Sequence, residues 1–372
     1  MKVGLVIDNY FPVLGGAEVH VYYLSKTLQH LGHDVIIYTN TLSKEDDVAL
    51  TVIRNTCGLK TNIRDLVRFI RNVDVVHCHY TYYLSSLTCF LAKLLRKPTV
   101  VTLHGLGTLD SSVGKSRRMK AYRWLSFKLA DAIIATSNEM AEVAERFAKR
   151  KKIYVIPNAV NTNYFKLSSP SNPKEDKIIV LSMRRLNPKN GVQYLVEAIP
   201  YIVGEFERIE FWIAGKTKLE SYLRKRVEEL GILKYVKFIG EIPNEKTKHY
   251  YEAADIVVFP SSAESTSIAC LEAMAMEKAV VASSLKVYKD LLGNSERGLL
   301  VELFDRDYSD YVAPLNLPEE RISALANAII TLSRDEVLCR ELGKRARKEV
   351  EKNYDWTIIA DRISQVYENL AT

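Results

Sequence analysis

The sequence lacks any long apolar run, and this absence excludes a membrane-spanning helix. No segment reaches the ~18 uninterrupted apolar residues that a span requires. A secretory signal peptide is also missing, because Met1 and Lys2 lead directly into the strand-like Val3–Ile7. Low-complexity tracts are absent, and 47% hydrophobic and 26% charged residues are typical of a folded chain. We therefore expect a cytoplasmic protein that is soluble or held peripherally on the inner membrane face.

Paired cysteines are missing as well. The five cysteines are odd in number, widely scattered and never arranged as Cys-x-x-Cys. This distribution argues for reduced thiols in a cytosolic compartment, and against a disulfide framework or a thiolate metal site. The fingerprint Gly-x-Gly-x-x-Gly is not found after the first strand, which disfavours an NAD enzyme.

Charge is distributed unevenly along the chain, whose net charge is +7. Residues 1–168 contain 23 Lys and Arg against 13 Asp and Glu, whereas the remainder contains 29 against 32. Much of the excess lies in Lys115–Arg123. A basic face suits a phosphorylated acceptor or an anionic membrane surface, although solvated helix faces explain it equally well. No recognised binding motif accompanies the charge, so we expect no nucleic-acid partner.

Short β-branched runs alternate with longer amphipathic segments, which is typical of parallel sheets built from βαβ units. With 372 residues, two domains are expected, and the Pro- and Ser-rich residues 166–177 are interpreted as the linker. From Pro318 onward the pattern is helical and ends in an amphipathic segment over Trp356–Leu370. The expected strands are Val3–Asp8, Asp34–Thr39, Asp74–His79, Thr99–Leu103, Ala132–Thr136, Ile153–Ile156, Ile178–Ser182, Ile209–Ala214, Val236–Ile239, Ile256–Pro260 and Ala279–Ala282.

Two loops that follow expected strands carry residues suited to ligand binding. Gly15 and Gly16 precede a helix predicted over residues 16–31, whose N-terminal N–H groups could face an anion; a plain tight turn is the alternative. Glu264 and Glu272 would lie about 12 Å apart at helical spacing, farther than a glycosidase pair. That separation suits two distant parts of one ligand, while a dipole-stabilised glutamate plus an exposed one is the simpler alternative.

A third loop, Met183–Gly191, brings arginine and lysine to the end of a strand. Such cations can hold a pyrophosphate and neutralise it as it leaves without a metal ion, although solvated loop cations are commoner. His77 and His79 share one face of a strand, so a metal pair is conceivable. Because no third ligand is evident, we favour hydrogen-bonded histidines near an acceptor site and expect no metal.

These segments, in this order, resemble the large retaining glycosyltransferase family of the GT-B fold, usually called family 4. The resemblance covers nearly the whole chain and includes Ile156–Asn161 and Ala254-Asp255. It implies two Rossmann-like, doubly wound α/β domains that face a central cleft. Residues 1–168 would bind the acceptor, with the C-terminal helix 356–372 packed back on them, and residues 169–355 would bind the nucleotide sugar.

The resemblance further implies a hexosyltransferase that takes its sugar from a UDP- or GDP-linked nucleotide diphosphate donor. The acceptor would be a glycan, a lipid-linked molecule or a small molecule, and no metal or cofactor would be required. The implied catalytic residues are Arg185, Lys189, Glu264 and His104. The implied donor-binding residues are Gly16, Ile242, Ser265, Thr266, Ser267, Ile268 and Glu272. The implied acceptor-binding residues are Gly15, Glu18 and His79.

Three departures from the family pattern bear on these roles. In the family, a lysine lies five residues after the arginine. This chain has Asn190 at that position and Lys189 one place earlier, so which side chain reaches the phosphate stays open. The usual Glu-Gly-Phe-Gly is Glu264–Ser267 here, which adds hydroxyls around the donor, and the usual Pro-Asn-Gly-Val-Asp is Pro157–Asn161. Rival functions are a non-catalytic nucleotide-sugar-binding subunit, a phosphorylase or an epimerase of related fold.

Overall fold

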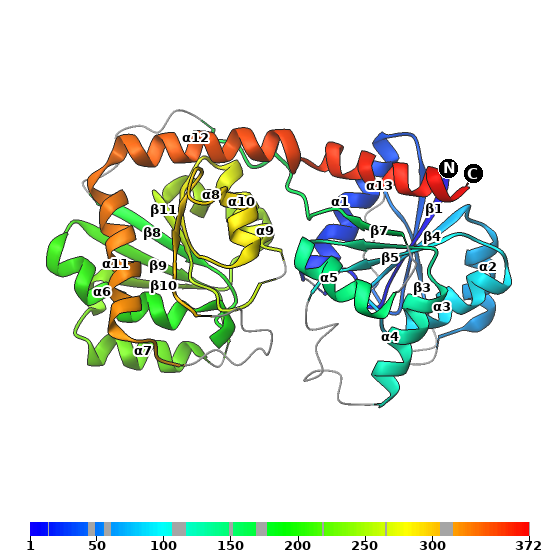
Figure 1. Ribbon diagram of the computed structural model, residues 1–372, viewed down its shortest axis with the longest axis horizontal. Coiled ribbons are helices and arrows are strands. Elements are labelled where there is room, and N and C mark those ends of the chain that lie inside the picture. The colour runs from blue at the N-terminus through cyan, green and yellow to red at the C-terminus, as the bar shows by residue number, and fades with distance from the viewer. Residues whose placement is uncertain are drawn as a thin grey trace. The chain divides into compact units, whose positions relative to one another are not determined.

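A computed structural model describes residues 1–13, 15–43, 49–55, 61–105, 117–148, 152–168, 177–217, 219–264, 266–305 and 315–371. The chain divides into two compact units (Figure 1). Unit 1 comprises Met1–Ala159 together with Tyr354–Thr372, and unit 2 comprises Val160–Asn353. Each unit contains a parallel sheet flanked by helices, so the expected α/β class is confirmed.

The described part of unit 1 contains a seven-stranded parallel sheet in the order β3-β2-β1-β4-β5-β6-β7. The chain proceeds outward from β1 to one edge and then from β4 to the other, which is the doubly wound Rossmann arrangement. Ligands of such sheets bind at the carboxyl ends of the strands where the direction reverses, here between β1 and β4. The strands are β1 (Lys2–Ile7), β2 (Asp34–Thr39), β3 (Thr51–Arg54), β4 (Val75–His79), β5 (Thr99–Leu103), β6 (Ala132–Ala135) and β7 (Lys152–Val155).

Unit 2 repeats the arrangement with a six-stranded sheet among its described residues, in the order β10-β9-β8-β11-β12-β13. The winding direction reverses between β8 and β11, so the loops after these two strands are the expected ligand-binding loops of this unit. The strands are β8 (Ile178–Met183), β9 (Ile209–Ala214), β10 (Val236–Gly240), β11 (Ile256–Phe259), β12 (Ala279–Ser283) and β13 (Leu299–Val301).

Three aspartates fix the register of neighbouring strands. Asp74, Asp131 and Asp255 each lie just before a strand, and each exchanges a backbone hydrogen bond and a side-chain hydrogen bond with one residue of the adjacent strand. Their carboxylates accept, at 2.7, 3.0 and 2.8 Å, from the backbone N–H groups of Lys2, Thr99 and Ile179. The repeated Asp before an apolar run therefore marks where parallel pairing begins, and Asp255 serves the sheet through this contact.

Helices cover both faces of the unit 1 sheet, as the near-continuous apolar strands require. Leu5 and Ile7 pack on one face with α1 and α13, whereas Val6 packs on the other with α2, α3 and α5. The helices of unit 1 are α1 (Gly16–His30), α2 (Ile63–Arg71), α3 (Tyr83–Leu94), α4 (Arg117–Leu129), α5 (Asn138–Phe147) and α13 (Trp356–Ala371).

In unit 2, α6 and α11 cover one face of the sheet with a continuous apolar core. None of the described helices in either unit combines the length and apolar composition needed to cross a bilayer. The helices of unit 2 are α6 (Val192–Glu205), α7 (Leu219–Glu229), α8 (Asn244–Ala253), α9 (Ile268–Ala275), α10 (Lys286–Leu292), α11 (Glu319–Arg334) and α12 (Glu336–Asn353), with short 3-10 turns at Pro188–Asn190 and Leu233–Tyr235.

The boundary between the units falls after Ala159, earlier than the linker expected over residues 166–177, of which 169–176 lie outside the described residues. Arg347 of α12 explains this position, because its guanidinium donates to the backbone carbonyls of Thr162, Phe165 and Ala275. These hydrogen bonds fasten the segment after Ala159 to unit 2.

Candidate active site

The loops after β8, β9 and β11 lie against one another at the carboxyl edge of the unit 2 sheet. Two glycines permit this contact. A Cβ on Gly215 would lie 1.9 Å from the carbonyl oxygen of Arg184, and a Cβ on Gly191 would lie 1.8 Å from that of Pro260. Both glycines also have left-handed backbones, with φ of 127° and 73°, which other residues rarely adopt. The tight packing brings the cationic loop beside the loop that carries Glu264.

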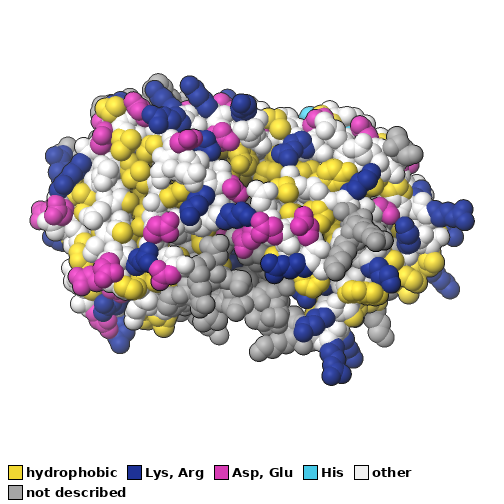
Figure 2. Space-filling model, viewed as in Figure 1, with side chains coloured by type: hydrophobic (Ala, Val, Ile, Leu, Met, Phe, Trp, Pro, Cys, Tyr) yellow, Lys and Arg dark blue, Asp and Glu magenta, His cyan; other side chains and the backbone are white. Residues whose placement is uncertain are grey.

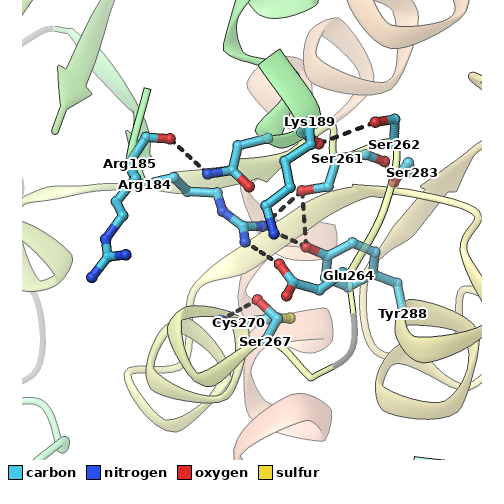
Figure 3. A network of polar contacts seen from close by, with 11 residues as sticks. Arg184, Arg185, Lys189, Ser261, Ser262, Glu264, Ser267, Cys270, Ser283 and Tyr288 are labelled. Atoms are coloured by element: carbon cyan, nitrogen blue, oxygen red, sulfur yellow. Dashed lines mark hydrogen bonds and ion pairs between the residues drawn. The ribbon is translucent and has the colours of Figure 1, made fainter. Parts of the chain in front are cut away.

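Arg184 is the centre of a polar network in this region (Figure 3). Its guanidinium forms an ion pair with the Glu264 carboxylate and donates to Ser261 Oγ at 2.8 Å and to the Tyr288 hydroxyl at 2.6 Å. Only 10% of the Arg184 side chain and 11% of the Glu264 side chain are exposed. Burial alone would lower the pKa of Arg184, but Tyr288 and Glu264 raise it above its ordinary value. The guanidinium is therefore charged, and it fixes the orientation of the carboxylate.

The side chains of the other two cations discussed in this loop, Lys189 and Arg185, point in different directions. Figure 3 shows the Lys189 side chain directed toward Glu264 and Tyr288, whereas the exposed Arg185 side chain points away from them. Burial lowers the pKa of the Lys189 ammonium, and Glu264 acts in the opposite sense. Asn190 is buried, and its side-chain amide donates to the Arg185 carbonyl oxygen at 2.6 Å. Asn190 therefore braces the loop, while Lys189 extends into the network.

Glu272 lies inside α9, eight residues after Glu264, and it is partly buried. The Tyr251 hydroxyl lies 3.0 Å from Glu272 Oε2 and 3.0 Å from the Ala269 carbonyl oxygen, and its single proton can serve only one acceptor at a time. Burial raises the pKa of Glu272 to about 7, and the hydrogen bond with Tyr251 offsets only part of this increase. A carboxylate held in this way retains capacity to accept hydrogen bonds from a ligand.

The N-terminus of α9 lies between the two glutamates in the sequence. Ser267 is buried, and its Oγ accepts from the backbone N–H of Cys270 at 3.3 Å, while the first N–H groups of the helix have no acceptor within it. Thr266 and Ile268 are partly buried, and Ser265 lies outside the described residues. Ile242 is partly buried in the loop after β10, at the same carboxyl edge of the sheet.

In unit 1, the corresponding edge carries the remaining predicted residues. Gly15 has an extended backbone with φ of −157°, so its own conformation does not require glycine. The exposed Gly16 begins α1, and Glu18 is buried in the first turn of that helix. His79 ends β4 and His104 follows β5, and His79 Nδ1 lies 2.8 Å from His104 Nε2. The structure thus joins two histidines that the sequence had placed in separate roles.

The family model described as glycosyl transferases group 1 matches residues 164–349, and the model described as glycosyltransferase family 4 matches residues 14–164. The chain belongs to the group 1 glycosyl transferases. It is 25% identical to phosphatidyl-myo-inositol mannosyltransferase of Mycobacterium tuberculosis over 100% of this chain and 97% of the relative. It is also 25% identical to the phosphatidylinositol N-acetylglucosaminyltransferase GPI3 subunit of Saccharomyces cerevisiae, over 100% of this chain and 83% of that protein.

Solved structures show the same fold and confirm the expected GT-B architecture. Sucrose-phosphate synthase from Thermosynechococcus elongatus aligns with a TM-score of 0.77 and 23% identity over 99% of this chain and 98% of its own. Anabaena HepE in complex with UDP and glucose aligns with a TM-score of 0.78 and 19% identity over the whole of both chains. At these identities the likeness concerns the fold alone.

Sequence reasoning did not select Arg184 in this glycosyltransferase. Arg184 and Arg185 are neighbours that follow β8, and the Arg184 N–H continues the strand pairing to Ala214 at 3.0 Å. Successive side chains of an extended segment point to opposite faces. The sequence predicts a cation here but does not say which of two adjacent arginines faces Glu264.

Sequence reasoning also missed His20, which is buried on α1. Its ring lies 4.8 Å from that of His104, and its Nδ1 lies 3.0 Å from Asn158 Oδ1. Helical spacing contained the signal, since His20 lies three residues after the buried Ala17 and four before the buried Leu24. Both ring nitrogens of His77, in contrast, are hydrogen-bonded, to the Tyr367 hydroxyl and to Thr102 Oγ1, each at 2.6 Å.

Proposed function

We propose that this glycosyltransferase moves a hexose-type sugar from a UDP- or GDP-linked donor to a lipid-linked acceptor, with retention of the anomeric configuration. The observation that carries the proposal is the Arg184–Glu264 pair, with Lys189 directed at it and Glu272 on the adjoining helix. The named activities of the mycobacterial and yeast relatives support sugar transfer to a phosphoinositide lipid. The HepE complexes with UDP and with UDP-glucose support a nucleotide donor.

The proposed donor site assigns one part of the nucleotide sugar to each group. Glu264, oriented by Arg184, accepts hydrogen bonds from hydroxyls of the transferred sugar. Glu272 accepts hydrogen bonds from the ribose, and Ile242 contacts the base. The diphosphate lies at the N-terminus of α9, where Ser267, Thr266 and Ile268 supply polar and backbone groups; Ser265 lies outside the described residues.

The chemistry then depends on stabilising the leaving group. The bond between the anomeric carbon and the diphosphate oxygen breaks, and charge develops on that oxygen. Lys189, the exposed Arg185 and the α9 N–H groups offset this charge, so the transfer needs no metal ion. The acceptor hydroxyl bonds to the anomeric carbon on the face that the diphosphate leaves, and its proton departs with the diphosphate.

Unit 1 is proposed to hold the acceptor. Gly15, Gly16 and Glu18 lie at the start of α1, where backbone N–H groups can hold an anionic group. The family resemblance assigns His79 to acceptor binding and His104 to catalysis. These roles follow the family resemblance and the placement of all five residues at the carboxyl edge of the sheet.

A basic and aromatic face on α3 and α4 supports a lipid-linked acceptor. Ser86 of α3 donates to the Tyr122 carbonyl of α4 at 2.7 Å, so the two helices form one surface. Trp124 is 54% exposed, and the Lys128 ammonium lies 4.6 Å from its ring centroid. Figure 2 shows Lys and Arg side chains at the α4 end of unit 1 beside hydrophobic side chains. Exposed members of this face are Tyr83, Phe90, Lys93, Leu94, Arg117, Arg118, Lys120, Trp124 and Lys128, whereas Lys115 and Ser116 lie outside the described residues.

We propose that this face contacts an anionic bilayer, because aromatic side chains favour the interface and cations attract anionic headgroups. Sedimentation with phosphatidylinositol-containing vesicles tests it. We expect Trp124→Ala and Lys128→Ala to weaken binding severalfold and added salt to weaken it further, with Tyr222→Ala in unit 2 as the control for loss of an exposed ring. Binding that is insensitive to salt and to both α4 substitutions would remove the membrane from the proposal.

Transfer itself is tested with the purified chain, a panel of UDP- and GDP-sugars, and phosphatidylinositol or a glycan acceptor. The expected result is a glycosylated acceptor whose anomeric configuration by NMR matches the donor, formed equally well in the presence of EDTA. A donor that raises the melting temperature without any transfer or hydrolysis would instead establish a non-catalytic nucleotide-sugar-binding subunit. Phosphate-dependent release of a sugar phosphate would establish a phosphorylase.

A further inference from the structure

Three histidines of unit 1 converge at the carboxyl edge of the sheet, from α1, from the end of β4 and from the loop after β5. His20, His79 and His104 each offer one ring nitrogen, and these three nitrogens all lie within 4.8 Å of one another. In a tetrahedral zinc site the nitrogen ligands lie about 3.3 Å apart, given Zn–N bonds of about 2.0 Å. The separations exceed that spacing by at most about 1.5 Å, which rotation of the rings would have to close.

Two of these histidines contain ring nitrogens that no described residue satisfies. His20 Nε2 and His79 Nε2 are buried and have no hydrogen-bond partner among the residues that the structure describes. A buried polar atom without a partner is costly, and native proteins usually satisfy such atoms with protein, water or an ion. The unsatisfied nitrogens belong to the same cluster, which points to a shared ligand.

Asn158 sets the tautomer that a metal requires. Its Oδ1 lies 3.0 Å from His20 Nδ1, so the proton of the neutral ring resides on Nδ1 and the lone pair is on Nε2. Neutral imidazoles are the form that binds zinc.

We propose that His20, His79 and His104 bind one zinc ion, with Asn158 orienting the first of them. Three imidazoles leave one coordination position for water or for a ligand oxygen. Of the three histidines, only His104 is partly exposed to solvent. This inference revises the sequence-based expectation, which found no third ligand beside His79. It shares His79 and His104 with the acceptor side proposed for unit 1, but it does not involve the donor-binding groups of unit 2.

Calorimetric titration of the chelator-treated full chain with zinc chloride tests the proposal. We expect one saturable site per chain, lost in His20→Ala and His104→Ala and weakened about 10- to 100-fold in Asn158→Ala. His249→Ala, an exposed histidine of α8, is the matched control and should bind as the wild type does. His104 is only partly buried, so its variant serves even if His20→Ala does not fold.

Cobalt(II) gives a second, local readout in the same site. The Trp356 ring lies 5.0 Å from the His20 ring, so bound Co²⁺ should quench Trp356 emission, and Trp356→Phe should abolish that quenching. Absence of saturable zinc binding, or equal binding by the wild type, His20→Ala and His104→Ala, would overturn the proposal and leave water as the partner of the unsatisfied nitrogens.

Discussion

The pKa of Glu272 leads to a quantitative prediction for donor binding. Burial raises this pKa to about 7, and ribose hydroxyls would donate to the ionised carboxylate. Below the pKa the carboxyl must lose its proton before it can accept both hydrogen bonds, so affinity falls as the pH falls. The ionised fraction is roughly one tenth at pH 6 and roughly nine tenths at pH 8. We therefore expect the Kd to be about tenfold higher at pH 6 than at pH 8, or about 1.4 kcal/mol.

Isothermal titration calorimetry with a nucleotide sugar measures this difference at pH 6, 7 and 8. A nucleotide sugar is preferable to a free diphosphate, because a terminal phosphate itself titrates near ~6. Glu272→Gln should bind weakly and without this pH dependence. Tyr251→Phe should move the profile to higher pH, because it removes the hydrogen bond that lowers the pKa of Glu272. Equal wild-type affinity at pH 6 and pH 8 would refute the assignment of Glu272 to the ribose.

Three further predictions concern stability and turnover. Folding raises the pKa of Glu272 from 4.5 to about 7, so its protonated form contributes stability that is present below pH 4.5 and lost as the pH rises through 7. Glu272→Gln should therefore raise the melting temperature at pH 8 but not at pH 4. Gly191→Ala should lower the free energy of unfolding in urea by more than ~1 kcal/mol, because its Cβ would meet a backbone carbonyl, whereas Gly204→Ala, with open space around it, should not destabilise; equal effects would contradict the packing argument. Arg184→Met should lower the free energy of unfolding by about 3 kcal/mol, because it leaves a buried carboxylate unpaired. Arg185 is exposed, so Arg185→Met should leave the free energy of unfolding unchanged and lower kcat about a hundredfold in steady-state kinetics. The reverse pattern would exchange the roles of the two arginines.

The sequence predicts the buried strands of both sheets well, because parallel strands covered on both faces appear as continuous apolar runs. The bounds of Asp34–Thr39, Thr99–Leu103 and Ile209–Ala214 agree with the structure at both ends. The apolar pattern of the sequence does not predict β3 and β13. These strands lie at sheet edges, and the burial of their residues is mostly partial, so their sequences lack the strong apolar pattern.

The sequence predicts which segments form the candidate site but not which of their side chains contact one another. Motif order identifies the loops that hold Lys189 and Glu264 and the helix that holds Glu272, because the strand ends of a doubly wound sheet gather at one edge. The choice between adjacent arginines depends on which face of an extended segment meets the next loop. The histidine cluster brings together His20, His79 and His104, which are distant in the sequence and meet only because of the strand order.

A crystal structure of the chain with a bound nucleotide sugar is the direct test of the proposed donor site. We expect sugar hydroxyls at Glu264 beside Arg184, the diphosphate at the first turn of α9 within reach of Lys189, and the ribose at Glu272. A nucleotide sugar bound away from the carboxyl edge of the unit 2 sheet, with the Glu264 and Glu272 carboxylates untouched, would contradict it.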